Sequence, residues 1–199
     1  MHSFFRVAIS VGMDRGVAYS SARKRIRDGD VLLFRRGDGI VSKMIAVAGR
    51  SPYIHAGMAV WWHDRLMCVE TIQGIGGRAA HLSAQVTAPH TTILVRRVRS
   101  RKFNRPAAAD AMLNVIGKRY GWWGLFKAAT IHLPIWRFLV KPDTDDKANG
   151  SLPFCSQAVA SALRAGGVDP VPNLADRLTE PGDLARSAAL RDVFILTSG

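Results

Sequence analysis

The sequence contains few cysteines, few acidic residues and no long uninterrupted hydrophobic run. Cys68 and Cys155 are the two cysteines among 199 residues. Two cysteines exclude the multiple-disulfide framework of small secreted scaffolds, and these two do not form a CxxC metal or redox pair. A single Cys68–Cys155 disulfide stays open, although it would consume the nucleophile that we consider below.

Acidic residues are outnumbered by basic ones. The chain has 15 Asp and Glu against 28 Lys and Arg, which gives a formal net charge of +13. A charge of this size predicts an anionic partner, such as nucleic acid, acidic lipid or a polyanionic cell-wall polymer. Charge alone is a weak signal, however, and a soluble protein that is merely basic is the alternative.

The sequence also lacks the patterns typical of a signal peptide and of a transmembrane helix. Residues 1–11 lack a basic region followed by a full apolar core and a small-residue cleavage site, so we predict no signal peptide. The apolar stretch 120–140 is interrupted by two basic residues, a histidine and a proline, which argues against a transmembrane helix. The compartment is left open, with phage lysis or a dedicated secretion machine as routes of export.

The length and the apolar content of 48% fit one domain with a sizeable core. We predict an N-terminal helical extension over residues 1–28, with one helix over 4–27, and a single domain over 29–199 with an apolar insertion at 120–140. Strands are predicted over 31–34, 55–62, 66–72, 91–98 and 193–196. Helices are predicted over 40–48, over 107–117, from Pro153 to Gly166 and over 182–190.

Cys155 is the candidate nucleophile. Pro153 fits an early helical position, so Cys155 falls in the first turn of a helix. The helix dipole there favours a thiolate, and the free backbone N–H groups of the first turn can donate to a developing oxyanion. The alternative is a small buried cysteine, which is the commonest fate of a lone thiol.

His55 is the best candidate for a general base among the six histidines. It begins a predicted strand, in which the small Gly57 and Ala59 share its face and are expected to leave room for a helix beside it. Glu70 is the candidate that orients the imidazole. If the hairpin pairs Gly57 with Glu70, the carboxylate lies on the His55 face; a register shifted by one residue would bring Gln73 there instead. Cys68 is predicted to be core.

Several motifs in this order resemble the permuted branch of the NlpC/P60 superfamily, the YiiX-like and LRAT-like papain-fold cysteine hydrolases. Histidine precedes cysteine in this sequence, as in the circularly permuted members, and the resemblance covers roughly residues 29–190. The matching pieces are Gly29-Asp30-Val31, Tyr53-Ile54-His55-Ala56-Gly57, Glu70 after an apolar strand, Gly117-Lys118-Arg119-Tyr120, Phe154-Cys155-Ser156-Gln157 and the 182–187 segment.

The resemblance implies a circularly permuted papain-like α+β fold, with a small antiparallel sheet and packed helices. It also implies hydrolysis of an amide, thioester or ester bond through an acyl-enzyme, with Cys155 attacking, His55 moving the proton and Glu70 orienting His55. No metal or organic cofactor is needed for this chemistry. Residues that we expect to contact the substrate are Tyr53, Tyr120, Trp122 and Trp123.

Three functions are consistent with these observations. The first is a peptidoglycan endopeptidase or amidase, such as one carried by a phage, which its basic charge would hold on the anionic wall. The second is a lipid acyl hydrolase or acyltransferase, in which the 120–140 segment contacts an anionic membrane surface. The third is a non-catalytic basic binding or structural module, such as a virion component. No specific nucleic-acid partner is expected, and the oligomeric state is left open.

Overall fold

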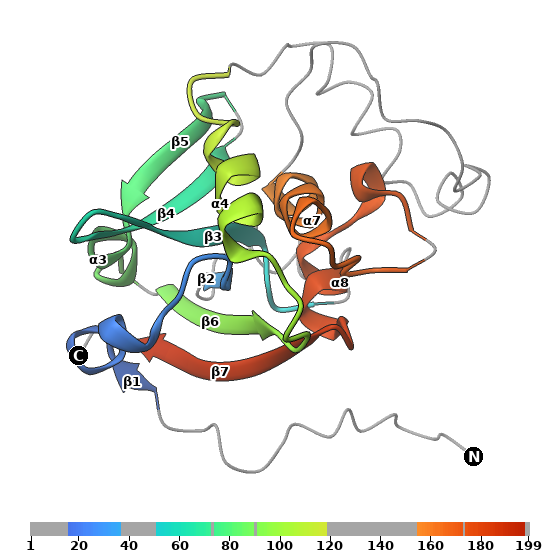
Figure 1. The fold of residues 1–199 in the computed structure, drawn as a ribbon. Helices are drawn as coiled ribbons and strands as arrows, with labels where there is room; N and C mark the ends of the chain where they lie inside the picture. Colours follow the sequence, from blue (N-terminus) through green and yellow to red (C-terminus); the bar gives the residue numbers. More distant parts are fainter. Residues whose placement is uncertain are drawn as a thin grey trace, which may run out of the picture.

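A seven-stranded sheet forms the centre of the part of the chain that the structure describes (Figure 1). The computed structural model describes residues 16–36, 51–72, 74–89, 91–118, 155–172 and 174–197. The strand order of the sheet is β1-β7-β6-β2-β3-β4-β5, with β1 parallel to β7 and every other neighbouring pair antiparallel. The strands are β1 (Val17–Ala18), β2 (Val31–Arg36), β3 (His55–Trp62), β4 (Arg65–Ile72), β5 (Gly76–His81), β6 (Thr91–Val98) and β7 (Leu190–Thr197).

Short helices complete the mixed α+β fold. Helices α4 and α7 lie side by side over the sheet (Figure 1). No helix among the described residues is long and apolar enough to cross a membrane. The helices are α1 (Tyr19–Ala22), α3 (Leu82–Val86), α4 (Arg105–Leu113), α7 (Cys155–Ala165) and α8 (Pro181–Arg186), with 3₁₀ turns η1 (Arg23–Arg25) and η2 (Asp176–Leu178).

Both faces of the sheet are buried, which explains the continuous apolar run at 31–34. Because successive strand residues point to opposite faces, Val31 and Leu33 pack with α4 and α7 in one cluster. Leu32 and Phe34 pack in a second cluster on the other face, together with buried residues of α3, α1 and β7. The sheet therefore separates two layers, and α7 and α3 belong to different ones.

A buried ion pair fixes the turn before β2. The Asp30 carboxylate is fully buried and accepts two hydrogen bonds from Arg97 of β6, at 2.8 and 2.6 Å. Its Oδ2 also accepts the backbone N–H of Arg27 at 2.9 Å, which closes the turn. Gly29 has φ +75°, a conformation that glycine adopts without strain. The Gly29-Asp30 motif therefore has a structural explanation here.

Several predicted elements agree with the structure, including β3 over 55–62 and β6 over 91–98. The segment before residue 29 differs from the single predicted helix, because within 16–28 it forms β1, α1 and η1. Strand β5 and helix α3 were not predicted, α4 ends at Leu113 and β7 begins earlier, at Leu190. The predicted helix over 40–48 and the apolar segment 120–140 lie outside the described residues.

Candidate active site

Strand β3 and helix α7 bring His55 and Cys155 together. Cys155 is the first residue of α7, and its sulfur is hydrogen-bonded to the His55 side chain. The backbone N–H groups of Ser156 and Ala56 also donate to this sulfur. Because Ala56 follows His55 directly, the thiol lies at the very beginning of β3, where the strand ladder ends.

Cys155 is positioned by the packing of α7. The buried side of the helix contributes Ala158, Val159, Ala162 and Leu163 to the cluster between the sheet and α4. At the start of the helix, the buried Ser156 hydroxyl donates to the backbone carbonyl of Thr179 at 2.5 Å. At its end, Gly167 takes φ +85°, a left-handed conformation typical of a residue that follows a helix.

The structure corrects one element of the predicted packing. We expected Gly57 and Ala59 to make room for the cysteine helix, but α7 packs on the opposite face, which carries Ala56, Met58 and Val60. A Cβ at Gly57 would lie 2.7 Å from the sulfur of Cys68, so the glycine accommodates a neighbouring strand rather than a helix. Helices α3 and α1 are the helices whose buried residues pack on the Gly57 side.

Of the two registers that the sequence left open, the structure has the one that brings Glu70 to the face of His55. Gly57 pairs with Glu70 across the β3–β4 hairpin, which puts the carboxylate on the His55 face. Glu70 Oε2 is 2.6 Å from Nε2 of His55. With Nε2 engaged by Glu70, Nδ1 is the ring nitrogen left to face the Cys155 sulfur. The imidazole thus links a helix of one layer to a carboxylate that lies in the other.

Two residues that the sequence did not reveal hold the other oxygen of Glu70. Arg78 of β5 donates to Oε1 from Nε at 2.9 Å and from Nη2 at 2.8 Å. Gln85 of α3 donates to the same oxygen at 3.1 Å. The Glu70 side chain is almost completely buried, and a buried carboxylate is stable when such partners satisfy its lone pairs. Strand β5 and helix α3 were both missed, so no sequence signal pointed to Arg78 or Gln85.

The pKa shifts at this site favour a charged pair. Burial alone would lower the pKa of His55, but the hydrogen bonds and negative charges of Cys155 and Glu70 raise it to about 10. Burial alone would raise the pKa of Cys155, but the His55 hydrogen bond and charge, with two backbone N–H groups, lower it. Burial opposes ionisation of Glu70 as well, and the contacts with His55 and Arg78 outweigh it and lower its pKa.

Of the four predicted substrate contacts, Tyr53 is the one that lies among the described residues. Tyr53 is partly buried and packs against the core cluster to which α7 contributes. Burial and the negative charge of Asp192 raise its pKa, against the opposing effect of nearby arginines. Phe34, the cross-strand partner of His55, places its ring centroid 5.3 Å from the imidazole. The other predicted substrate contacts, Tyr120, Trp122 and Trp123, lie outside the described residues.

Comparison with known proteins shows a similarity of fold. No protein-family model and no curated protein matches the sequence. Among solved structures, the crystal structure of the metalloprotein YiiX from Escherichia coli O157:H7 is similar, with a TM-score of 0.57 and 16% sequence identity. The match covers 84% of this chain and 96% of that chain. The chain therefore has a fold like that of YiiX, which agrees with the coarser part of the predicted resemblance.

Proposed function

We propose that the protein is a cysteine hydrolase that works through an acyl-enzyme. The observation that carries the proposal is the continuous chain of hydrogen bonds from Cys155 through His55 to Glu70. A nucleophile next to a base, with the base oriented by a third group, is the arrangement that activates a side chain for acyl transfer. The lowered pKa of Cys155 and the raised pKa of His55 favour a thiolate beside an imidazolium.

In the first half-reaction, the Cys155 thiolate attacks the carbonyl carbon of the substrate, and the electron pair of the carbonyl bond moves to its oxygen. Backbone N–H groups in the first turn of α7 are suited to stabilise that oxyanion, because a first turn has no intrahelical acceptors for them. The carbonyl bond then reforms and the bond to the leaving nitrogen breaks, while the His55 imidazolium gives its proton to that nitrogen. A thioester on Cys155 and a free amine result.

In the second half-reaction, water replaces the amine. Neutral His55 takes a proton from the water as its oxygen attacks the thioester carbonyl. The carbon–sulfur bond breaks, the acid leaves and Cys155 returns to a thiolate beside protonated His55. Glu70 stays ionised throughout, holds the imidazole by Nε2 and stabilises its positive charge.

For the substrate, we propose a peptide amide bond of peptidoglycan. The formal charge of +13 supports this choice, because a strongly basic protein concentrates on an anionic cell wall. The alternative of a lipid acyl substrate depends on the 120–140 segment, which lies outside the described residues. We therefore carry forward a peptide bond of peptidoglycan as the proposed substrate.

A metal requires separate consideration, because the similar structure is that of a metalloprotein. Among the described residues, no group of three or more His, Cys, Asp and Glu side chains is arranged to hold a metal ion. Both carboxylate oxygens of Glu70 are engaged by His55, Arg78 and Gln85. These residues do not fit a metal centre, so we derive no step through one.

The proposal can be tested on purified cell-wall sacculi. We expect the protein to release soluble peptide-bearing fragments and Cys155→Ser to release none. Intact-mass spectrometry with an activated acyl substrate should reveal an adduct on Cys155 that is lost in the serine variant. Equal release by both proteins would overturn the proposal, and fatty-acid release from liposomes without wall hydrolysis would replace the substrate by lipid.

A further inference from the structure

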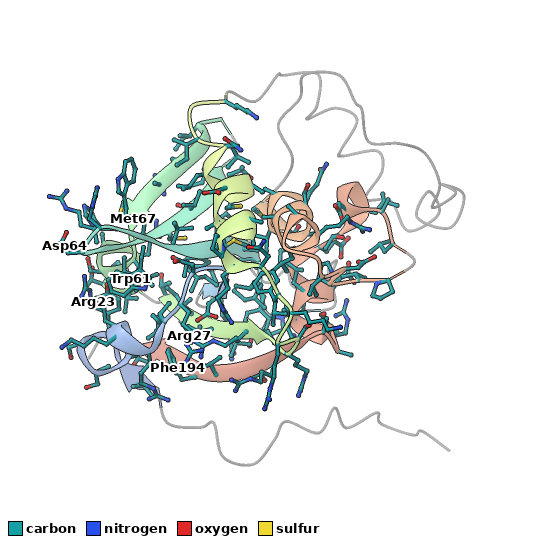
Figure 2. All side chains as sticks on the ribbon, viewed as in Figure 1. Arg23, Arg27, Trp61, Asp64, Met67 and Phe194 are labelled. Atoms are coloured by element: carbon teal, nitrogen blue, oxygen red, sulfur yellow. The ribbon has the colours of Figure 1, made fainter. Side chains whose placement is uncertain are left out.

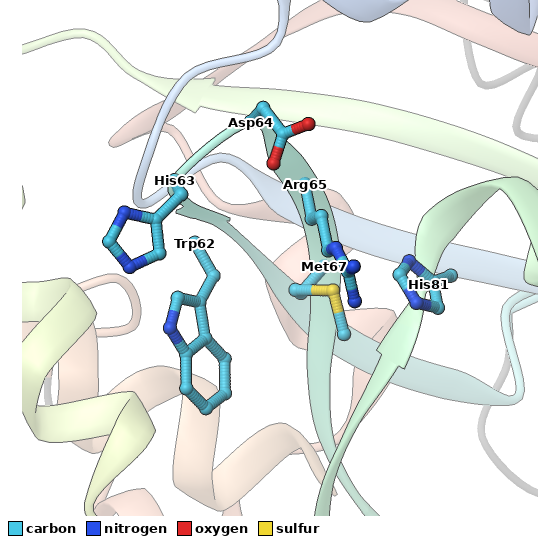
Figure 3. A pocket seen from close by; sticks show the side chains of 6 residues that line it. All are labelled: Trp62, His63, Asp64, Arg65, Met67 and His81. Carbon is cyan, nitrogen blue, oxygen red and sulfur yellow. The ribbon is translucent and has the colours of Figure 1, made fainter.

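A hollow of about 430 Å³ lies at the hairpin that joins β3 to β4, at the opposite end of β3 from the candidate active site (Figure 3). The seven residue steps from His55 to Trp62 extend over roughly 23 Å at the usual rise per strand residue. The hollow is therefore separate from the Cys155 site. The residues that line it are Trp62, His63, Asp64, Arg65, Met67 and His81.

Strand register builds the floor of this hollow. Trp62 pairs with Arg65 across the hairpin, and Met67 pairs with His81 on the next strand. Cross-strand partners share a face of the sheet, and Arg65 and Met67 are two residues apart on one strand. An indole, a guanidinium, a thioether and an imidazole consequently lie on one face of the sheet, where Figure 3 shows their side chains around the hollow.

Trp62 is 55% exposed, and Ile75 is the other large apolar residue with comparable exposure among the described residues. Its neighbours are held in place. The Arg23 guanidinium lies 4.6 Å from the ring centroid of Trp61 and also donates to the backbone carbonyl of Asp64 (Figure 2). The hairpin thus presents an exposed aromatic ring on a fixed support, and preorganisation of this kind lowers the entropic cost of binding.

The backbone of His63 has an uncommon conformation. It has φ +52°, the one positive φ among the described non-glycine residues. A residue that has a side chain loses free energy in this left-handed conformation, whereas glycine adopts it without that cost. Positive φ is what a two-residue hairpin turn requires of its first residue, and His63 is the first of the two residues between Trp62 and Arg65. The turn thus fixes His63 at the hollow that it lines.

We propose that this hollow binds an acidic saccharide. The exposed face of an indole suits the apolar face of a pyranose ring, because both are flat and both lose water on contact. Arg65 supplies a permanently charged fork for a carboxylate, and the imidazoles and Asp64 supply donors and an acceptor for hydroxyl groups. The inference rests on the proposed function, in which the hollow would hold a MurNAc unit that carries no peptide and so keeps its lactyl carboxylate, while Cys155 cleaves a peptide attached elsewhere on the same glycan strand.

The experiment is an NMR titration of ¹⁵N-labelled protein with the disaccharide GlcNAc–MurNAc, which carries a carboxylate, and with neutral chitobiose. We expect the acidic disaccharide to shift the Trp62 indole N–H signal with a dissociation constant of about 1 mM or below, and chitobiose to bind several-fold more weakly. Trp62→Ala should weaken binding of the acidic disaccharide by about tenfold. Arg65→Gln should remove the preference for it over chitobiose.

Matched controls are available on the same chain. Ile75→Ala removes the other exposed apolar side chain and Arg101→Gln removes an exposed arginine before α4, and neither should change the affinity. His63→Gly should weaken binding while the melting temperature stays equal or rises, because glycine relieves the positive φ. Melting curves that match wild type will show that the Trp62 and Arg65 variants are folded.

Three results would overturn the inference: no titration up to about 10 mM ligand, equal affinity of wild type and Trp62→Ala, or tighter binding of a single-stranded oligonucleotide through the same residues. The failure of the proposed function has a different signature. Cys155→Ser should bind the disaccharide as wild type does, so binding without hydrolysis retains this site and removes the hydrolase. Hydrolysis without Trp62-dependent binding retains the hydrolase and removes the saccharide site.

Discussion

Cys155 begins helix α7 and Cys68 lies in the middle of strand β4, and these two regions give the same functional group opposite properties. Cys68 is fully buried among apolar residues. Burial and the nearby negative charge of Glu70 raise its pKa well above the ordinary value, although Arg78 acts in the opposite direction. Cys155 is also penalised by burial, but it receives hydrogen bonds from His55 and from two backbone N–H groups, and its pKa falls.

The comparison shows that hydrogen-bond donors distinguish the two thiols, in addition to a difference in exposure, since Cys68 is buried and Cys155 is partly buried. Both sulfurs experience desolvation, which disfavours a thiolate. The difference is that the end of β3 and the start of α7 supply N–H donors and a positive charge, whereas a strand centre has already used its N–H groups in the ladder. The following predictions test this contrast, beginning with the largest effect.

The largest expected effect comes from replacing each cysteine by serine. Cys155→Ser should lower kcat/KM by at least about 10³-fold, because the hydroxyl is a far weaker nucleophile in this setting, while stability changes little. Cys68→Ser should leave kcat/KM of the folded protein unchanged and lower the free energy of unfolding by about 1–3 kcal/mol, since it buries a hydroxyl in an apolar cluster. Sacculus hydrolysis and chemical denaturation measure the two quantities. A reversed pattern would contradict the assignment.

Glu70→Gln should have the next largest effect. The amide occupies similar space but cannot stabilise a positively charged His55, so kcat/KM should fall by about 10²–10⁴-fold. We also expect the pKa of His55 to fall, because the Glu70 charge helps to raise it. NMR titration of the imidazole measures that pKa, and an unchanged value would remove Glu70 from the account.

Arg78→Met should have a smaller effect, about tenfold in kcat/KM. Arg78 lowers the pKa of Glu70. In its absence Glu70 takes up a proton at higher pH, so the acidic limb of the pH–rate profile should move upward. Arg101→Met, which changes an arginine far from the carboxylate in sequence, serves as the charge control. A tenfold loss without a shift of that limb would indicate a structural role alone.

The smallest effect on activity is expected from Gly57→Ala. The added Cβ would lie 2.7 Å from the Cys68 sulfur and 3.2 Å from the Val69 carbonyl oxygen, which should cost about 1–3 kcal/mol of stability. Adding Cys68→Ala removes the sulfur and should restore part of that loss. A double-mutant cycle in urea measures the coupling. Strictly additive losses would mean that Cys68 is not the residue that requires a glycine at position 57.

The sequence predicted β3 and β4 better than the elements around them. The apolar runs over 55–62 and 66–72 predicted β3 and β4, whereas the sequence left the hairpin register open, and the structure shows the register that pairs Gly57 with Glu70. The Gly76–His81 segment is rich in glycine and alanine and lacks strand periodicity, so β5, and Arg78 with it, gave no signal. The side of the sheet on which α7 packs could not be deduced either, because both faces are apolar and only tertiary packing distinguishes them.

The most direct test of the contrast between the two thiols is the rate of iodoacetamide labelling at each cysteine as a function of pH, resolved by peptide mass spectrometry. We predict that Cys155 reacts at mildly acidic pH at a rate at least about 100-fold above that of Cys68, because its thiolate persists below the ordinary thiol pKa. His55→Ala should move the Cys155 inflection upward. Equal, slow labelling of both cysteines at mildly acidic pH, unaffected by His55→Ala, would contradict the account.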